Sequence, residues 1–205
     1  MSRTDTHPRR KEQIIDAAAV VFARHGLQQT RMDDIVKEAG ISKGSIYWYF
    51  ESKDAVIEAL MERMFSPEFA WLRTMVQQDD LSVYERLMAF TERSLMLVQH
   101  VQQQGLLPLF VDYIALATHD AQARQVFQTY NQTARDLLVP LFAYAVECGE
   151  FRPVDPDCAY LSYAALVDGL LIGEYCYDHH LPLPQRIRAS VQLLLDGLRT
   201  PTGVR

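Results

Sequence analysis

The chain has 205 residues, of which 49% are hydrophobic and 22% are charged, and its formal net charge is −6 at pH 7. These values are typical of a globular protein with one large domain, or with a small domain and a larger one, and they exclude a disordered chain. The charge is uneven, because residues 1–50 carry a net charge of +2 and residues 51–205 a net charge of −8. A basic end on an acidic body favours a polyanionic partner at that end alone.

The cysteines and the apolar runs narrow the class of protein further. Cys148, Cys158 and Cys176 show no C-x-x-C spacing, so we expect reduced thiols and no metal site. The first residues lack the apolar core of a signal peptide. The longest apolar run, 137–146, is about half as long as a membrane span requires. We therefore expect a cytoplasmic protein without a membrane partner.

Apolar side chains recur at helical spacing along nearly the whole chain, as Ile14, Ala18, Val21 and Phe22 illustrate. No run of alternating apolar and polar residues is bounded by hairpin turns. The predicted fold class is therefore all-α.

Three helices are predicted at the N-terminal end of the chain. They span residues 8–25, 31–39 and 43–49. Gly26 is expected to stop the first helix in a left-handed conformation, and Ser42 is expected to cap the third. Thr30 and Asp33 have the spacing of a capping box, which would start the second helix at Arg31.

Seven further helices are predicted to follow. They span residues 53–65, 66–78, 83–103, 108–118, 120–148, 156–177 and 183–198. Ser66 and Pro67 form a helix-start signal that separates the first two of these helices, and Pro140 is expected to kink the longest. The helix that begins at Lys53 joins two parts of the chain. We therefore predict a three-helix head of residues 1–52 and a larger helical body of residues 53–205.

Residues 32–49 read as helix, glycine turn and helix, the pattern of a helix-turn-helix whose second helix enters the major groove of DNA. Four apolar residues, Ile35, Ala39, Ile41 and Ile46, are spaced to bury the corner between the two helices. Small, basic and aromatic side chains remain on the outer face, where they suit phosphates and base edges. The residues expected to contact DNA are Lys43, Gly44, Ser45, Tyr47 and Trp48, with Thr30, Arg31 and Lys53 at the starts of the neighbouring helices.

A helix-turn-helix also occurs as a plain packing unit. A helical protein-interaction module without DNA binding therefore remains an alternative on the pattern alone. An enzyme is not expected, because the sequence has no glycine-rich phosphate loop, no nucleophile elbow and no paired metal-ligand motif. No cofactor is expected for the same reason.

Residues 10–60 resemble the TetR family of bacterial transcriptional regulators. The shared elements are Ile-x-x-Ala-Ala-x-x-x-Phe at 14–22, Ala-Gly-Ile-Ser-x-Gly at 39–44 and Ile-Tyr-x-Tyr-Phe at 46–50, while Val36 departs from the family's usual Ala. The resemblance implies a ligand-responsive regulator, a repressor in most cases, that binds a palindromic operator of double-stranded DNA as a homodimer. It also implies that Ser42 and Tyr49, at the two ends of the recognition helix, belong to the DNA-binding set.

The last two predicted helices look like the dimerisation helices of that family, and the stretch 159–173 is apolar on nearly all sides, as a buried helix is. The alternative is that both helices are buried inside one chain. In a dimer they would form a four-helix bundle with the partner's helices. The expected interface residues are Tyr160, Ala164, Gly169, Gly173, Ile187, Val191, Leu194, Leu195 and Leu198.

Regulators of this family also carry a small-molecule pocket in the body, so the resemblance implies an effector of unknown identity. Aromatic and methionine side chains of the body suggest that the effector is small and apolar. Each of these side chains could equally be plain core. The candidate lining residues are Trp71, Met75, Phe90, Met96, Phe110, Tyr113, Phe127, Tyr130, Tyr163 and Asp168.

Overall fold

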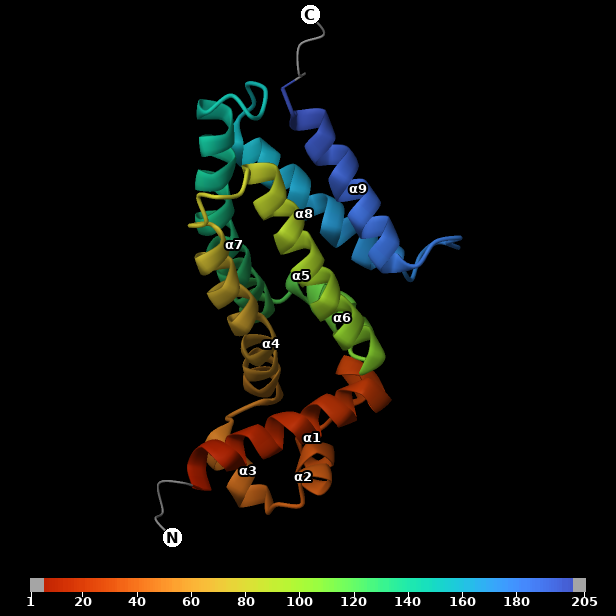
Figure 1. Cartoon of the computed structure of the whole chain (residues 1–205). Coiled ribbons are helices and arrows are strands. Elements are labelled where there is room, and N and C mark those ends of the chain that lie inside the picture. The colour runs from red at the N-terminus through yellow and green to blue at the C-terminus, as the bar shows by residue number, and fades with distance from the viewer. Residues whose placement is uncertain (1–5, 201–205) are drawn as a thin grey trace, which may run out of the picture. The chain divides into compact units, whose positions relative to one another are not determined.

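The computed structural model describes residues 6–200, and within them the chain folds into nine α-helices. The helices are α1 (Thr6–Gln29), α2 (Met32–Ala39), α3 (Lys43–Tyr49), α4 (Lys53–Met75), α5 (Val83–Gln103), α6 (Leu107–Ala117), α7 (Ala121–Glu147), α8 (Pro156–Gly173) and α9 (Leu183–Leu198) (Figure 1). An isolated antiparallel bridge joins Phe151 to Arg199. The all-α fold class is confirmed.

Helices α3, α5 and α9 have the bounds that the sequence predicts. The Oγ atom of Ser42 accepts a hydrogen bond from the backbone N–H of Ser45 at 3.2 Å, so the predicted cap of α3 is confirmed. Gly26 has a positive φ of 70°, but its ψ of 178° lies outside the left-handed helical region and helical turns continue to Gln29, so the predicted left-handed stop of the first helix at Gly26 is wrong.

The start of α2 differs by one residue from the prediction. Arg31, not Thr30, is the N-cap, and its backbone N–H donates to Asp34 Oδ2 at 3.0 Å. The hydroxyl of Thr30 donates instead to the carbonyl of Gly26 at 2.7 Å and is buried. The acid that satisfies the free N–H of the cap is therefore Asp34, while Asp33 faces solvent.

The predicted break at Ser66–Pro67 is wrong, because α4 runs through Pro67 to Met75. A proline inside a helix removes one backbone hydrogen bond, and that cost must be offset. Met61 and Leu72, on either side of the proline, are both buried, and Phe65 and Phe69 each pack edge-on or stacked against another aromatic ring. Tertiary packing along one continuous helix therefore outweighs the local start signal.

Helix α8 ends at Gly173, four residues before the predicted end at Tyr177. The residues that follow, including Tyr175 and Tyr177, are exposed, so no buried face extends the helix. A ring nitrogen of His179, Nε2, lies 2.9 Å from the carbonyl oxygen of Gly173. The same carbonyl also accepts the backbone N–H groups of Cys176 at 3.1 Å and Tyr177 at 3.2 Å, so the turn that follows α8 is closed on Gly173.

The described residues pack into two compact units. The first contains residues 6–66 and 100–128, and the second contains residues 67–99 and 129–200. Helices α4, α5 and α7 each contribute residues to both units. The predicted boundary at residue 52 separates two predicted functions and does not coincide with a boundary between the packed units. It stays a prediction.

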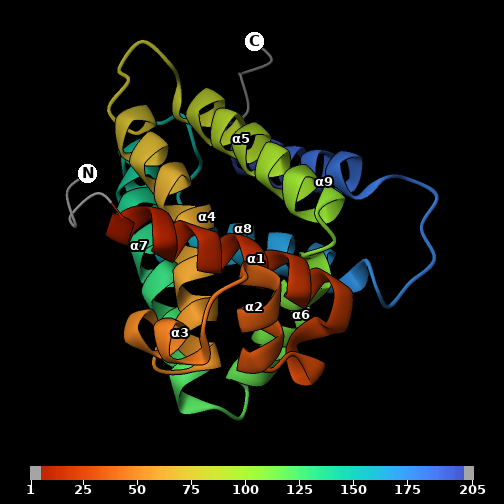
Figure 2. The same cartoon turned by 90° about the horizontal axis from the view of Figure 1, so that it is seen from below.

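In the first unit α1 packs against α2 and α6, and Figures 1 and 2 show α1 crossing the short helices α2 and α3. Ile14, Phe22, Ile35, Ile46 and Leu60 are almost entirely buried in this unit. Each such side chain contributes about 1.5–3 kcal/mol through its burial. This core holds the angle between α2 and α3 and leaves the other side of α3 in solvent.

In the second unit α8 and α9 lie side by side (Figure 1). The start of α5 is capped by a residue distant in the sequence. Both carboxylate oxygens of Glu150 accept backbone N–H groups, from Val83 at 2.9 Å and from Tyr84 at 2.7 Å. A negative charge at a helix N-terminus is stabilising, so Glu150 ties the loop after α7 to α5.

None of the helices between residues 6 and 200 is long and apolar enough to cross a membrane.

Candidate nucleic-acid interface

The solvent side of α3 carries two large aromatic side chains. Tyr47 is 46% exposed and Trp48 is 65% exposed, while the residue before them, Ile46, is fully buried. The ring of Tyr49 meets that of Trp48 edge-on, with 4.7 Å between the centroids, and Tyr49 itself is half-buried. Tyr49 therefore supports Trp48 from the side and has only part of its surface available to a partner.

The N-terminal turn of α3 is held in place by its own side chains. The hydroxyls of Ser42 and Ser45 lie 2.7 Å apart. A Cβ atom added to Gly44 would meet no other atom within 4 Å, so the space beside this glycine is open. The ammonium of Lys43 pairs with both carboxylate oxygens of Asp33 in α2, at 2.7 and 3.0 Å. The hydrogen bond with Asp33 raises the pKa of Lys43 above its ordinary value, so the pair favours the charged form of the lysine.

The residues outside α3 that were predicted to contact DNA differ in their exposure and in their hydrogen-bond partners. The structure corrects the prediction for Thr30, whose buried hydroxyl holds the turn and is not turned towards solvent. The ammonium of Lys53 donates to the carbonyls of Leu27 at 2.8 Å and Thr30 at 3.2 Å, so a DNA contact by Lys53 stays a prediction. Arg31 is exposed and is the residue of this group whose side chain faces solvent.

A capped helix-turn-helix that presents a basic residue and two exposed aromatics defines a DNA-binding head. Residues 14–60 match the family described as bacterial regulatory proteins, tetR family. Residues 83–200, more than half of the chain, match the C-terminal part of BetI-type transcriptional repressors. The chain therefore belongs to the TetR family of DNA-binding transcriptional regulators, and it is a regulator rather than an enzyme.

Similar proteins include regulators of comparable length. TtgR, an HTH-type transcriptional regulator of Pseudomonas putida, is 31% identical over 201 residues, which cover 95% of this chain and 94% of the relative. YfiR of Bacillus subtilis is 28% identical over 192 residues, which cover 91% and 90%. Among solved structures, the fatty acid degradation regulator FadR from Bacillus halodurans is 26% identical, with coverage of 92% and 99% and a TM-score of 0.75.

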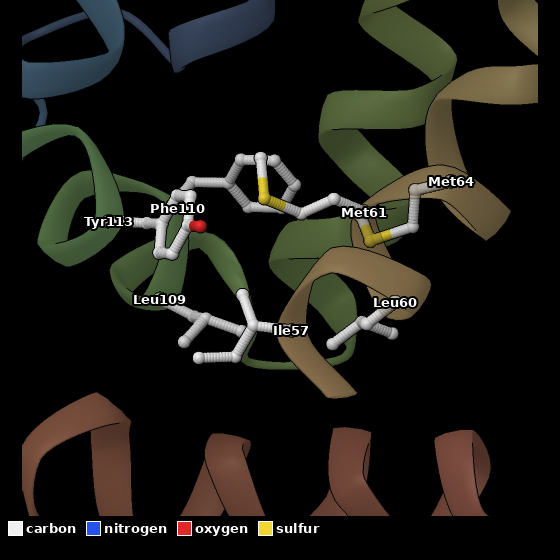
Figure 3. A pocket seen from close by; sticks show the side chains of 7 residues that line it. All are labelled: Ile57, Leu60, Met61, Met64, Leu109, Phe110 and Tyr113. Carbon is white, nitrogen blue, oxygen red and sulfur yellow. The ribbon is translucent and has the colours of Figure 1, made fainter. Parts of the chain in front are cut away.

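An apolar pocket lies between α4 and α6 in the first unit, and Figure 3 shows side chains of the two helices facing each other across it. Its volume is about 10 Å³, which is room for about one water molecule. Of the predicted lining residues it brings together Phe110 and Tyr113. The lining residues are Ile57, Leu60, Met61, Met64, Leu109, Phe110 and Tyr113.

The pocket residues of α4 were missed by sequence reasoning, although a signal was present. Positions 57, 60, 61 and 64 have the spacing of one helical face. That spacing also describes an ordinary core stripe, so only the facing residues of α6 distinguish a pocket from plain core. The other predicted lining residues do not line this pocket; they are Trp71, Met75, Phe90, Met96, Phe127, Tyr130, Tyr163 and Asp168.

Several of these residues have other neighbours in the structure or lie on its surface. The hydroxyl of Tyr163 lies 3.0 Å from that of Thr91 in the core of the second unit, where burial raises the pKa of Tyr163 to about 12. The guanidinium of Arg93 lies 5.6 Å from the ring centroid of Trp71. Burial raises the pKa of Asp168, and Met96 is exposed on α5. A pocket role for these residues stays a prediction.

The predicted dimer stripe of α9 is corrected in the same way. Ile187, Val191, Leu195 and Leu198 are buried inside the chain, since they form the side of α9 that packs within the second unit. On α8, Tyr160 and Gly173 are buried as well. Burial in one chain, the alternative that the sequence left open, therefore holds for these six residues. Three of the predicted residues stay half-buried or exposed: Ala164, Gly169 and Leu194.

The outward side of α8 and α9 is apolar at other positions. Leu193 is 76% exposed, Leu161 55% and Ile172 37%, and Ala165 and Gly169 on the same side of α8 are also exposed. Because α8 is apolar all round, its sequence could not reveal which side faces the chain's own core. The exposed residues Leu161, Ala165 and Gly169 follow i, i+4 and i+8 spacing, so they lie on one side of α8. A partner helix could pack against this side.

Proposed function

We propose that this regulator is a repressor that binds a palindromic operator as a homodimer through α3 and leaves the DNA when a small apolar effector binds. The observation that supports the proposal best is the solvent side of α3, where Tyr47 and Trp48 stand exposed on a capped helix beside Lys43. Neighbouring exposed apolar side chains form a patch, and such patches mark interaction sites more often than single exposed side chains do. Recognition helices contact the DNA backbone and base edges with such side chains.

The experiment is a binding titration of a short duplex that the wild-type protein selects from a random pool. Replacing Tyr47 or Trp48 with Ala is expected to weaken binding by about fivefold or more, because each removes a contact worth about 1–3 kcal/mol. Tyr144→Ala is the matched control, since Tyr144 is 52% exposed on α7 in the second unit. Equal affinity of all three variants would show that α3 does not read the DNA.

We assign the functions to the two predicted segments, DNA binding to residues 1–52 and effector binding and dimerisation to residues 53–205. The protein would act in the cytoplasm, where its DNA lies. The outward side of α8 and α9, with Leu161, Ile172 and Leu193 exposed, is the surface proposed for the dimer. A second copy of the chain would bury these residues and place two recognition helices on one duplex.

The effector proposal rests on the pocket between α4 and α6. Its side chains are apolar apart from the hydroxyl of Tyr113, and the two methionines, Met61 and Met64, are flexible enough to make room for a ligand. Since its volume of about 10 Å³ fits no more than a water molecule, effector binding would require α4 and α6 to move apart. The relative named for fatty acid degradation, FadR of Bacillus halodurans, is in keeping with apolar chemistry.

Movement of α4 offers a route to the DNA-binding head within the first unit. Lys53, the first residue of α4, holds the carbonyls of Leu27 and Thr30, just before α2. Further along α4, Arg63 pairs with Glu12 at 3.4 Å and Asp16 at 2.6 Å on α1. A shift of α4 would disturb both ties and shift the population of the head away from its DNA-binding arrangement. Thermal melts with a panel of apolar compounds test this step, since an effector raises the melting temperature of the protein and lowers its DNA affinity.

A further inference from the structure

The ammonium of Lys43 is already occupied in the protein without DNA. It lies 2.7 Å from Asp33 Oδ1 and 3.0 Å from Asp33 Oδ2, so both oxygens of one carboxylate share it. The pair is fully on the surface, with the side chains of Lys43 and Asp33 63% and 64% exposed. Neither residue is needed by the core, and the pair links the first turn of α2 to the first turn of α3.

The pair also lies next to the aromatic side of α3. Lys43 and Tyr47 are one helical turn apart and therefore share a face. A carboxylate that offers two oxygens and one negative charge to an ammonium resembles the two free oxygens of a DNA phosphate. Asp33 thus presents to Lys43 the same chemistry that DNA would present.

Neighbouring acids of α2 are engaged elsewhere. Asp34 accepts the backbone N–H of Arg31 at 3.0 Å, and Glu38 pairs with Arg24 at 2.9 Å. Asp33 is the acid of α2 that meets the recognition helix. Its charge lies beside the ammonium of Lys43, so a phosphate that approached this lysine would meet the repulsion of Asp33 as well as its hold on the ammonium.

We propose that Asp33 sets the DNA affinity of this regulator by competing with DNA phosphate for Lys43. The inference rests on the proposed role of α3 in DNA binding. Phosphate contacts are independent of sequence, so the competition lowers affinity for operator and non-operator DNA alike. Removal of the Asp33 charge would release one cation per chain for the phosphate backbone.

The test compares Asp33→Asn with Glu38→Gln, which removes the same charge from the same helix but belongs to the pair with Arg24. Affinity is measured over a range of salt concentrations for two duplexes of equal length, one selected by the wild-type protein and one unselected. Asp33→Asn is expected to bind both duplexes about three- to tenfold more tightly at low salt, and by at least about threefold more than Glu38→Gln. The slope of log affinity against log salt should steepen by about 0.9 for each chain bound.

The same comparison in a Lys43→Gln background shows whether Asp33 acts through the lysine. There, the advantage of Asp33→Asn over Glu38→Gln should shrink to the part that repulsion causes, since the competition for Lys43 has been removed, and an advantage of unchanged size would refute the competition. Asp33 also stands in the first turn of α2, where a negative charge is stabilising, so each variant is checked by a thermal melt. Asp33→Ser, which also removes the charge, replaces Asp33→Asn if that variant unfolds.

Each outcome decides the question. If the wild-type protein selects no duplex from a random pool and binds no DNA at low salt, the proposed role of α3 fails, and the inference fails with it. If the wild-type protein binds but Asp33→Asn matches Glu38→Gln, the role of α3 stands and the competition by Asp33 is refuted. Weaker binding by Asp33→Asn would mean that Asp33 positions Lys43 for its contact, which is the opposite of the proposal.

Discussion

In this chain the surroundings of a side chain indicate more about its role than its residue type does. Tyr163 is fully buried with its hydroxyl against Thr91, whereas Tyr47 is half exposed on a short capped helix. Thr30 and Lys53, both polar and near the head, bond to backbone carbonyls. The sequence alone predicts a functional role for all four, and the structure shows that their exposure and their hydrogen-bond partners differ.

Asp168 on α8 offers a prediction at the scale of one residue. Burial raises the pKa of its carboxyl above the ordinary value of 3.8, so the charged form is disfavoured in the folded protein. As pH rises above 3.8 the unfolded chain loses this proton first, and stability falls until the folded carboxyl also ionises. Asp168→Asn should therefore raise the melting temperature near neutral pH.

The gain from Asp168→Asn should disappear below pH 3.8, where the carboxyl is neutral in both states. Asp136→Asn is the control, because Asp136 is exposed on α7. A gain that persists unchanged at acid pH would mean that burial of the charge is not the cause.

At the scale of the helices, local sequence signals predicted helix ends correctly where a side chain accepts the free backbone N–H groups of the first turn. Ser42 caps α3, and Asp155 caps α8 by accepting the N–H groups of Asp157 and Cys158. The errors came where distant packing decided, as at Pro67, where burial on both sides carries α4 through a proline. The cap of α5 by Glu150 could not be predicted either, since 66 residues separate it from Tyr84.

Glu150→Ala tests how far the distant cap of α5 contributes to stability. The substitution leaves the N–H groups of Val83 and Tyr84 without the carboxylate, and a lost helix cap costs about 0.5–2 kcal/mol. We expect a lower midpoint of denaturant unfolding for Glu150→Ala than for Glu147→Ala, which removes an exposed acid nearby. Equal midpoints would show that solvent replaces the cap at no cost.

At the scale of the whole molecule, the family and the all-α class could be read from residues 10–60 and from helical spacing. The surface proposed for the dimer could not be read, because α8 is apolar on every side. Only the structure shows that Ile187 and Val191 face inward while Leu193 faces outward. The pocket had the same difficulty, since its α4 residues also fit a core stripe.

Leu193→Glu tests the proposed dimer. A charge at this position would be buried by a second chain, so the variant should have the mass of one chain in light scattering where the wild-type protein has the mass of two. Met96→Glu is the control, because Met96 is 65% exposed on α5. A dimer that survives Leu193→Glu would place the interface elsewhere.

Photo-crosslinking from α3 tests most directly the central claim that the solvent side of α3 contacts the operator. A photoreactive phenylalanine analogue replaces Trp48 in one sample and Tyr144 in another, and each is irradiated with the selected duplex. We expect a protein–DNA crosslink from position 48 that high salt abolishes, and none from position 144. No crosslink from position 48, from protein that still binds the duplex, would contradict it.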